Sequence, residues 1–314
     1  MGALIILKSN IGGRNAVLLP SQMQPGRALA SKSSLQAITF DAWTALVAFS
    51  FLGLVTVLYA AIAVDLASEW WLVDAASYGM LIPPTALYIA YLRRDITLNV
   101  PAQSDLRGLW LLALGCVVLL LGKLAAEFFL MRISLVVVLA GLAWTFWGLE
   151  RFKTLAFPFV LLLTMVPLPT IVYNALAAPL QLFASRIATD LAQAMGVSAF
   201  RDGNIIQLAN TSLGVEEACS GLHSLSALMV ASLLLGHLES GKVPKRLLLF
   251  LLSIPFAIGV NVLRVTGTAL LADYKVELAM GFYHSFSGWL VFVAGFGVLW
   301  FAGKLLFRKA PVMA

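Results

Sequence analysis

The chain has 314 residues, of which 61% are hydrophobic and only 11% are charged. A soluble globular domain carries about a quarter charged residues, so the composition excludes that class and predicts a polytopic membrane protein. The formal net charge of +6 does not indicate a nucleic-acid partner, because the basic residues are spread between apolar runs instead of gathering on one face.

The cysteine and histidine content argues against a disulfide framework and against a metal site. The two cysteines are Cys116 and Cys219, and Cys116 lies inside the apolar run Leu109 to Gly122. Only three histidines are present, and no CxxC or HExxH spacing occurs. These are the spacings that usually mark zinc or redox sites. The sequence therefore predicts no metal and no cofactor.

The N-terminal segment differs in composition from the rest of the chain. Residues 1–40 are polar and basic, which predicts a cytoplasmic tail, and residues 41–314 are predicted to form an integral membrane domain. The apolar stretch Ala3 to Leu7 is too short for the core of a signal peptide. We therefore expect no cleaved signal.

Eight stretches of the membrane domain approach the roughly 20 apolar residues that cross a bilayer. With the N-terminus inside, 15 of the 21 Lys and Arg residues fall on the cytoplasmic side and six on the other. This bias follows the positive-inside rule, so both termini are predicted to be cytoplasmic. The predicted spans are 43–64, 74–92, 108–122, 133–149, 154–171, 222–238, 245–263 and 284–306.

Residues 172–200 have a different pattern, with one apolar helical face and one polar face. This spacing favours a helix that lies in the membrane interface or against the bundle rather than a lipid-exposed span. If the helix does cross, every later span reverses direction. The turn at Arg201–Asn204 and the extended piece Asn204–Leu208 predict a short hairpin before the sixth span. The apolar face comprises Leu176, Leu180, Phe183, Ile187, Leu191 and Met195.

The fold class that follows is an all-α, polytopic membrane bundle. It has about eight transmembrane helices, with an external amphipathic helix and a short hairpin before the sixth. The predicted topology brings three groups of polar residues to the external ends of consecutive spans. Cys219 precedes the sixth, Asn261 and Arg264 end the seventh, and His284 and Gly288 begin the eighth. A polar group at such a position is a candidate functional residue.

A thiol, an imidazole and a guanidinium together are suited to nucleophilic catalysis. A histidine can take the proton of the Cys219 thiol and later return it to a leaving amine. Arg264 cannot act as a base, but its cationic fork can stabilise an oxyanion. His223 follows Cys219 by four residues and would share its helical face, so it competes with His284 for the role of base. Glu216 and Glu217 are either solvated carboxylates or candidates for orienting that base.

The same residues resemble the three motifs of the exosortase/archaeosortase family. Glu217-Ala218-Cys219-Ser220-Gly221, Asn261-x-x-Arg264 and His284-x-x-x-Gly288 occur in the family's order, each beside a predicted span. Pro167-Leu168-Pro169, ahead of the external segment, is also similar to the family pattern. The resemblance covers roughly residues 75 to 306.

The resemblance implies a membrane-embedded cysteine protease or transpeptidase of the prokaryotic inner membrane. Its substrates would be membrane-anchored proteins with a C-terminal sorting signal, namely a short motif, a membrane helix and a basic cluster, as in PEP-CTERM proteins. The protein would be cleaved at the extracytoplasmic face and passed to an unknown acceptor. The family's catalytic residues fall on Cys219, Arg264 and His284. Supporting positions are Glu217, Asn261, Ser220, Gly221, Gly288 and His223.

Two other functions fit the membrane character of the chain. In a transporter, Arg264, Glu216 and His284 would line a path, although the chain has no convincing internal repeat of the kind common in transporters. In a non-catalytic subunit of an export or polysaccharide apparatus, Cys219 would be dispensable for substrate processing. Substitution of Cys219 separates both alternatives from a thiol-dependent enzyme.

Overall fold

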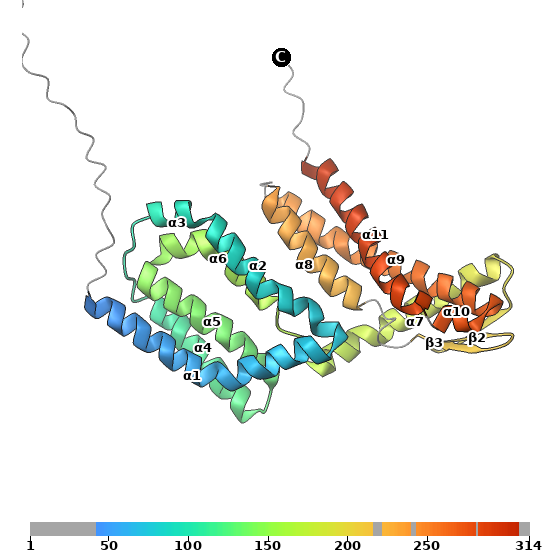
Figure 1. Cartoon of the computed structure of the whole chain (residues 1–314), viewed down its shortest axis with the longest axis horizontal. Helices are drawn as coiled ribbons and strands as arrows, with labels where there is room; N and C mark the ends of the chain where they lie inside the picture. Colours follow the sequence, from blue (N-terminus) through green and yellow to red (C-terminus); the bar gives the residue numbers. More distant parts are fainter. Residues whose placement is uncertain (1–41, 216–221, 240–242, 281, 308–314) are drawn as a thin grey trace, which may run out of the picture. The chain divides into compact units, whose positions relative to one another are not determined.

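The computed structural model describes residues 42–215, 222–239, 243–280 and 282–307 (Figure 1). The chain divides into two compact units, Met1–Ala45 and Leu46–Ala314. Within the described residues, the first unit contributes only the first turn of α1. The helical bundle belongs to the second unit.

The described residues are mainly helical, and much of their surface is apolar. Four helices are long and apolar enough to cross a membrane: Leu46–Leu72 of α1, α5, α9 and Phe286–Phe307 of α11. Two further apolar helices, α4 and Ser224–Leu238 of α8, are shorter. The elements are α1 (Ala42–Leu72), the 3-10 helix η2 (Asp74–Leu81), α2 (Ile82–Leu92), α3 (Arg94–Asn99), α4 (Gly108–Leu124), α5 (Phe128–Trp147), α6 (Leu149–Leu163), α7 (Thr170–Ala194), β1 (Ala199–Asp202), β2 (Ile205–Leu208), β3 (Ser212–Gly214), α8 (Leu222–Leu238), α9 (Val243–Tyr274), α10 (Val276–Met280) and α11 (Phe282–Phe307).

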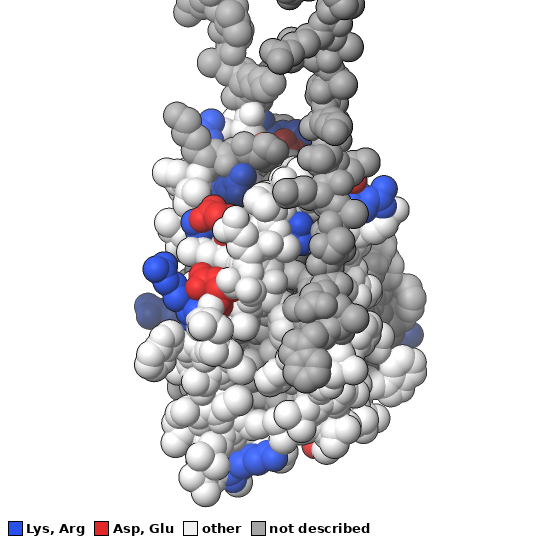
Figure 2. Space-filling view, turned by 90° about the vertical axis from the view of Figure 1, so that its left-hand side faces the viewer, with Lys and Arg blue, Asp and Glu red and all other residues white. Residues whose placement is uncertain are grey.

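These features define a polytopic helical membrane protein, as predicted. Figure 2 shows a face on which charged side chains are few and most of the surface is uncharged. Large apolar side chains such as Val57 and Trp110 are about four-fifths exposed, at 79% and 82%. Exposed apolar surface on this scale marks contact with lipid or with another protein. The total of eight crossings stays a prediction.

Glycines allow α4 and α5 to pack closely. Gly108, Gly115 and Gly122 recur every seven residues on α4, and a side chain at any of them would collide with α5. A Cβ on Gly115, for example, would lie 2.6 Å from Cγ2 of Val138 and 3.0 Å from its backbone nitrogen. Small residues are common where membrane helices pack because their backbones can then approach.

Side-chain contacts join helix ends that the predicted topology places on the cytoplasmic side. Arg151 of α6 donates to the Val100 carbonyl after α3, and Lys304 of α11 pairs with Glu239 after α8 at 2.8 Å. The imidazole of His237 in α8 stacks on Phe157 of α6, with ring centroids 3.6 Å apart. These contacts therefore connect ends of α3, α6, α8 and α11. The predicted topology, in which successive spans alternate in direction, places the same ends on one side of the membrane.

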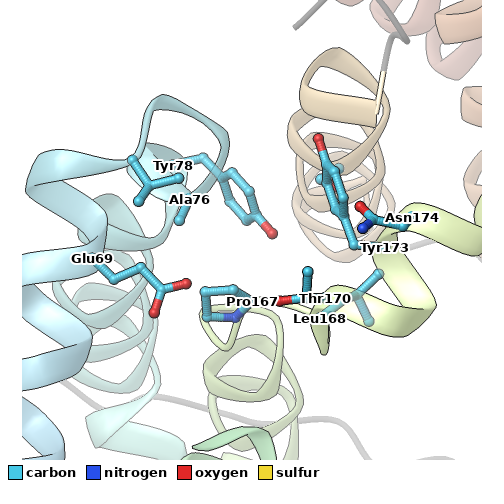
Figure 3. Close-up of a pocket in the computed structure, with 10 residues that line it drawn as sticks. Glu69, Ala76, Tyr78, Pro167, Leu168, Thr170, Tyr173 and Asn174 are labelled. Atoms are coloured by element: carbon cyan, nitrogen blue, oxygen red, sulfur yellow. The ribbon is translucent and has the colours of Figure 1, made fainter. Parts of the chain in front are cut away.

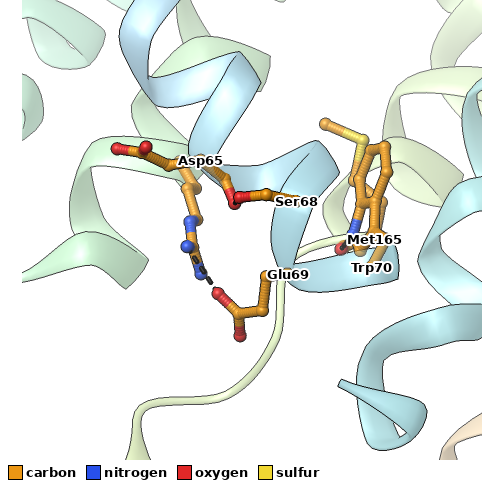
Figure 4. A network of polar contacts seen from close by, with 6 residues as sticks. Asp65, Ser68, Glu69, Trp70 and Met165 are labelled. Atoms are coloured by element: carbon orange, nitrogen blue, oxygen red, sulfur yellow. Dashed lines mark hydrogen bonds and ion pairs between the residues drawn. The ribbon is translucent and has the colours of Figure 1, made fainter. Parts of the chain in front are cut away.

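A matching set of contacts joins the ends predicted to lie on the other side. The buried Arg132 at the start of α5 pairs with Glu69 at the end of α1, with Nη2 2.5 Å from Oε2. The Trp70 indole donates to the Met165 carbonyl after α6 at 3.0 Å. Figure 4 shows both contacts around the end of α1. The two sets of contacts support the predicted antiparallel order of the spans.

Helix α7 forms where an amphipathic helix was predicted, but it packs through a different face. The side chains that it buries are small, and Ala188 and Ala192 are fully buried against Val265 and Ala269 of α9. The larger apolar residues are mostly exposed, including Leu176 at 46% and Met195 at 66%. Small side chains let the two helix backbones approach, which leaves the large ones outside. Although 25 residues long, α7 is not among the helices apolar enough to span.

The predicted hairpin is present but belongs to a three-stranded antiparallel sheet in the order β1-β2-β3. Ala199 to Asp202 pairs with Ile205 to Leu208 as expected. The third strand, Ser212–Gly214, was not predicted, because three residues are too few to show an alternating pattern. It places Leu213 opposite Ile206, and both side chains are buried against α9.

The close packing of α4 and α5 predicts a large difference between two glycine substitutions. Gly115→Val inserts a side chain where Val138 already stands, and overpacking of this kind costs about 1–3 kcal/mol. Gly53→Val in α1 is the matched control, since a Cβ there meets no atom within 4 Å. We expect purified Gly115→Val to unfold at a lower temperature than Gly53→Val when intrinsic tryptophan fluorescence is followed in detergent. Equal unfolding temperatures would contradict the packing described here.

Candidate functional site

The three helices that carry or follow the candidate motifs pack against one another. Helices α8, α9 and α11 each contact the other two (Figure 1). Their shared core contains the fully buried Leu228 of α8, Leu249 of α9 and Leu299 of α11. Gly295 of α11 lies against Leu228, where an added Cβ would come within 3.1 Å of a methyl group. The helices that carry the second and third motifs, and the helix that follows the first, thus form one cluster.

The second and third motifs meet directly. Arg264 of α9 donates from Nε to the Ser287 hydroxyl of α11 at 3.2 Å. A Cβ on the neighbouring Gly288 would lie 3.5 Å from one Nη atom of Arg264, so the helix backbone of α11 lies next to the guanidinium. Asn261, one turn before Arg264, is 2% exposed. Arg264 of the Asn-x-x-Arg motif therefore lies against Ser287 and Gly288 of the His-x-x-x-Gly motif.

Helix α9 continues well beyond Arg264, whereas the sequence predicted that the seventh span ends there. Arg264 lies 21 residues after Val243, which is about 31 Å along a helix and matches the thickness of a bilayer's hydrocarbon core. The remaining turns, to Tyr274, are stabilised by packing against α7 and the sheet. A guanidinium within a helix is held more rigidly than one at a fraying terminus.

The Cys219 segment connects two buried anchors. Val215 is 2% exposed, and its amide donates to the Asn204 carbonyl at 2.9 Å. Leu222, the first residue of α8, is 4% exposed. The predicted site residues Cys219, Glu217, Ser220 and Gly221 lie between these anchors and outside the described residues.

The two candidate bases occupy equivalent positions in the fold. His223 lies in the first turn of α8 and His284 in the first turn of α11, while both side chains lie outside the described part of the chain. His237 lies near the far end of α8, about 21 Å from His223 by helical rise. It is therefore remote from the segment that contains Cys219.

A pocket not predicted from the sequence lies beside the start of α8 (Figure 3). It has a volume of about 250 Å³. It brings together the end of α1, the start of η2, the connection from α6 to α7, the first turns of α7, and α8. The proline pair of the family pattern contributes Pro167 to its wall. The lining residues are Glu69, Val73, Ala76, Tyr78, Pro167, Leu168, Thr170, Tyr173, Asn174 and Ser226.

The wall of the pocket at α1 is held in place by a tryptophan. The Trp70 indole, which donates to the Met165 carbonyl, covers Gly79 so closely that a Cβ there would overlap the indole nitrogen. Pro167, in the connection between α6 and α7, is two residues after Met165. The bond thus ties this connection to α1 and fixes one side of the pocket.

The fold and site define a polytopic membrane protein with a polar site where three apolar helices meet. The model of the transmembrane exosortase family (EpsH) matches residues 70–301, and the chain belongs to that family. No curated protein and no solved structure matches the chain significantly. Among the residues that the structure describes, no group of three or more His, Cys, Asp or Glu side chains is arranged to hold a metal ion.

Ser287 is a site residue that sequence reasoning missed. It occupies an unspecified position within His284-x-x-x-Gly288, and its buried hydroxyl is 3% exposed. The only sequence signal was its spacing of three residues from His284, which places both on one face of a helix. Serines in apolar helices commonly bond to their own backbone, as Ser232 does to the Met229 carbonyl, so a serine at this position does not by itself indicate a contact with another helix.

The contact with Arg264 predicts that Ser287→Ala lowers activity without unfolding the protein. A hydrogen bond to a charged group contributes about 1.5–3 kcal/mol, so we expect the protease or transpeptidase activity that the family implies to slow by roughly 10- to 100-fold. Ser232→Ala is the matched control, because this buried hydroxyl bonds only within its own helix turn. Cleavage rates in membranes, normalised to protein level, make the comparison. Similar rates for the two variants would contradict a role for Ser287.

Proposed function

We propose that the protein is a cysteine-dependent membrane peptidase or transpeptidase that cleaves a C-terminal sorting signal. Membership of the exosortase family implies protease or transpeptidase activity. The observation that supports this chain's own site is the contact between Arg264 and Ser287 beside Gly288, which joins two of the three motifs. The first motif, which contains Cys219, follows Val215, and Val215 is buried with the sheet against the same helix that carries Arg264.

In this proposal Cys219 is the nucleophile, and His284 or His223 is the base. The base removes the thiol proton, and the thiolate sulfur attacks the carbonyl carbon of the scissile peptide bond. The carbonyl oxygen becomes an oxyanion, which the Arg264 guanidinium stabilises. Collapse of this intermediate breaks the carbon–nitrogen bond. The leaving amine takes the proton from the histidine, and a thioester joins Cys219 to the substrate.

The second half of the reaction resolves the thioester. An acceptor with a nucleophilic amine or hydroxyl, or water, attacks the thioester carbonyl while the histidine takes its proton. The Cys219 sulfur leaves and recovers a proton, so the enzyme returns to its initial state. Transfer to an amine or hydroxyl is transpeptidation or esterification, and transfer to water is hydrolysis. No cofactor is consumed in this sequence.

The proposed location is the inner membrane of a prokaryote, with both termini cytoplasmic and the site extracytoplasmic. The excess of Lys and Arg on one side of the predicted spans supports this orientation. The substrate is a membrane-anchored protein whose signal combines a short motif, a membrane helix and a basic cluster. Its helix enters the bundle from the lipid, which brings the bond to be cleaved to the level of Arg264.

The proposal predicts that Cys219→Ala abolishes cleavage while the protein remains in the membrane. A thioester cannot form without the sulfur, and serine at this position is a far weaker nucleophile than a thiolate, so Cys219→Ser is expected to be inactive as well. Cys116→Ala is the matched control, because Cys116 is exposed on α4. Immunoblotting of a co-expressed substrate with a three-part C-terminal signal reports the size shift. Full cleavage by Cys219→Ala would exclude a thiol nucleophile and favour the transporter or the assembly subunit.

We predict that the Arg264 guanidinium is required for cleavage and that a lysine ammonium cannot replace it. Removing one oxyanion donor costs about 100- to 1000-fold in turnover, and lysine lacks the fork that lets one nitrogen bond Ser287 while others face the reacting carbonyl. Arg264→Ala and Arg264→Lys should therefore both show a fall of this order in the cleavage rate. Wild-type rates in Arg264→Lys would contradict this prediction and indicate that a positive charge alone suffices at this position.

The two candidate bases are separated by their pH profiles. Loss of the catalytic imidazole removes the group that deprotonates Cys219, so the rate in that variant should rise with pH until the thiol ionises by itself. We expect this profile for one of His284→Ala and His223→Ala and a near wild-type profile for the other. Cleavage measured from pH 5.5 to 9 in detergent-solubilised protein decides between them. Wild-type profiles in both variants would contradict histidine catalysis.

A further inference from the structure

The pocket of about 250 Å³ lies beside the helix that follows the Cys219 segment. Ser226, its contribution from α8, is four residues after the buried Leu222 and therefore on the same helical face. Its other walls come from Glu69, Tyr78 and Thr170, at helix ends that the predicted topology places on the side of Cys219. The pocket therefore lies at the end of α8 that directly follows the Cys219 segment.

The pocket has polar groups but no uncompensated charge. Its one ionic group is Glu69, whose Oε2 atom pairs with the buried Arg132 at 2.5 Å. The Glu69 side chain is 29% exposed, so the carboxylate remains accessible from the pocket while its charge is balanced from within. No Lys or Arg is among the lining residues. This combination does not suit a phosphate group, which binds where cations or free amides converge.

The remaining polar groups suit a ligand that both donates and accepts hydrogen bonds. Figure 3 shows Tyr78 and Tyr173 projecting from opposite sides toward the cavity, with Glu69, Thr170 and Asn174 around its margin. Hydroxyl and amide groups donate and accept, and a carboxylate accepts. A polypeptide main chain offers the matching pattern, because every residue other than proline carries one N–H and one C=O.

The size and walls of the pocket also favour a short piece of polypeptide. Pockets for whole small molecules are usually about 300–1,000 Å³, and this one, at about 250 Å³, is smaller. It accommodates a few backbone units with small side chains. Val73, Ala76 and Leu168 provide apolar surface for those side chains. Burying a charged side chain here would require a counter-charge that the walls do not offer.

We propose that this pocket is a substrate subsite that binds a short, extended and uncharged polypeptide segment next to the bond that is cleaved. Glu69, Thr170 and Asn174 bond the main chain, and the two tyrosines enclose it. The proposal rests on the proposed function, since it names the place where that enzyme holds its substrate. Residues at the pocket thus act through binding, whereas Cys219 and Arg264 act on the reacting carbonyl.

Filling the pocket provides the first test. Thr170→Phe places a ring in the pocket from the start of α7, and Ile171→Phe places the same ring on the adjacent residue, which is exposed and outside the pocket. With a sorting-signal protein that the wild type cleaves, we expect Thr170→Phe to raise KM at least about tenfold with kcat little changed, which is the mark of lost ground-state binding. Ile171→Phe should keep the wild-type KM. An unchanged KM in Thr170→Phe would overturn the subsite.

Photo-crosslinking tests binding without turnover. A benzophenone amino acid is placed at position 170 or 171 of full-length Cys219→Ala protein, which is then irradiated in membranes that contain the same substrate. We expect a substrate adduct from position 170 but not from position 171, mapped by mass spectrometry to residues adjoining the cleaved bond. Equal adducts from both positions, or adducts with lipid alone, would overturn the proposal.

The experiments distinguish a wrong thiol mechanism from a wrong assignment of the pocket. If Cys219→Ala still cleaves the substrate, the thiol mechanism is wrong whatever the crosslinks show. If Cys219→Ala is inactive while Thr170→Phe has wild-type kinetics and position 170 gives no adduct, the enzyme is confirmed and the subsite is wrong. Asn174→Asp adds a charge at the rim, and we expect it to restore binding of a substrate variant with lysine in the bound segment. No such gain over wild type would contradict contact with that segment.

Discussion

The hydrogen bond between Arg264 and Ser287 depends on the close approach of α9 and α11. A guanidinium on a long side chain has many rotamers, and it is useful to a reaction only when they are restricted. Ser287 is buried on one side, and the backbone at Gly288 leaves room for the planar group on the other. The core shared by α8, α9 and α11 holds this arrangement. The packing of these three helices thus holds the Arg264 side chain in position.

Composition and charge placement predicted the helical order of the chain, because membrane helices are selected by simple physical requirements. Each span needs enough apolar length, and basic residues favour one side. The contacts at the two sets of helix ends agree with that order. The errors arose where tertiary packing determines the outcome. Helix α9 is longer than its apolar stretch because Val265, Ala269 and Ala272 pack on α7 and the sheet. Similarly, α7 buries alanines instead of its leucines. Small side chains let the backbones of α7 and α9 approach closely, and this close packing stabilises the pair more than burial of a few large side chains would.

In the site, too, residues that belong to short sequence motifs were predicted, and residues defined by contacts between distant segments were missed. Arg264 and Gly288 were recognised because each belongs to a short motif, and the structure brings them together. Ser287 was missed because a serine in an apolar helix usually bonds to its own backbone, and only the partner helix distinguishes it from Ser232. The pocket was missed for a stronger reason. Its walls extend from Glu69 to Ser226, and no single segment of that range carries a pattern that predicts a cavity.

The ion pair between Glu69 and Arg132 joins two helices that are synthesised at different times. The two residues are 63 positions apart, so at about 5–20 residues per second the ribosome makes Glu69 roughly 3–13 s before Arg132. During that interval Glu69 can stay hydrated at the membrane surface, at the end of α1. Arg132 is almost completely buried, and a buried cation requires its partner. The guanidinium of Arg132 can therefore leave water only when α1 and α5 pack together, so the burial of this site and the pairing of the two helices are one event.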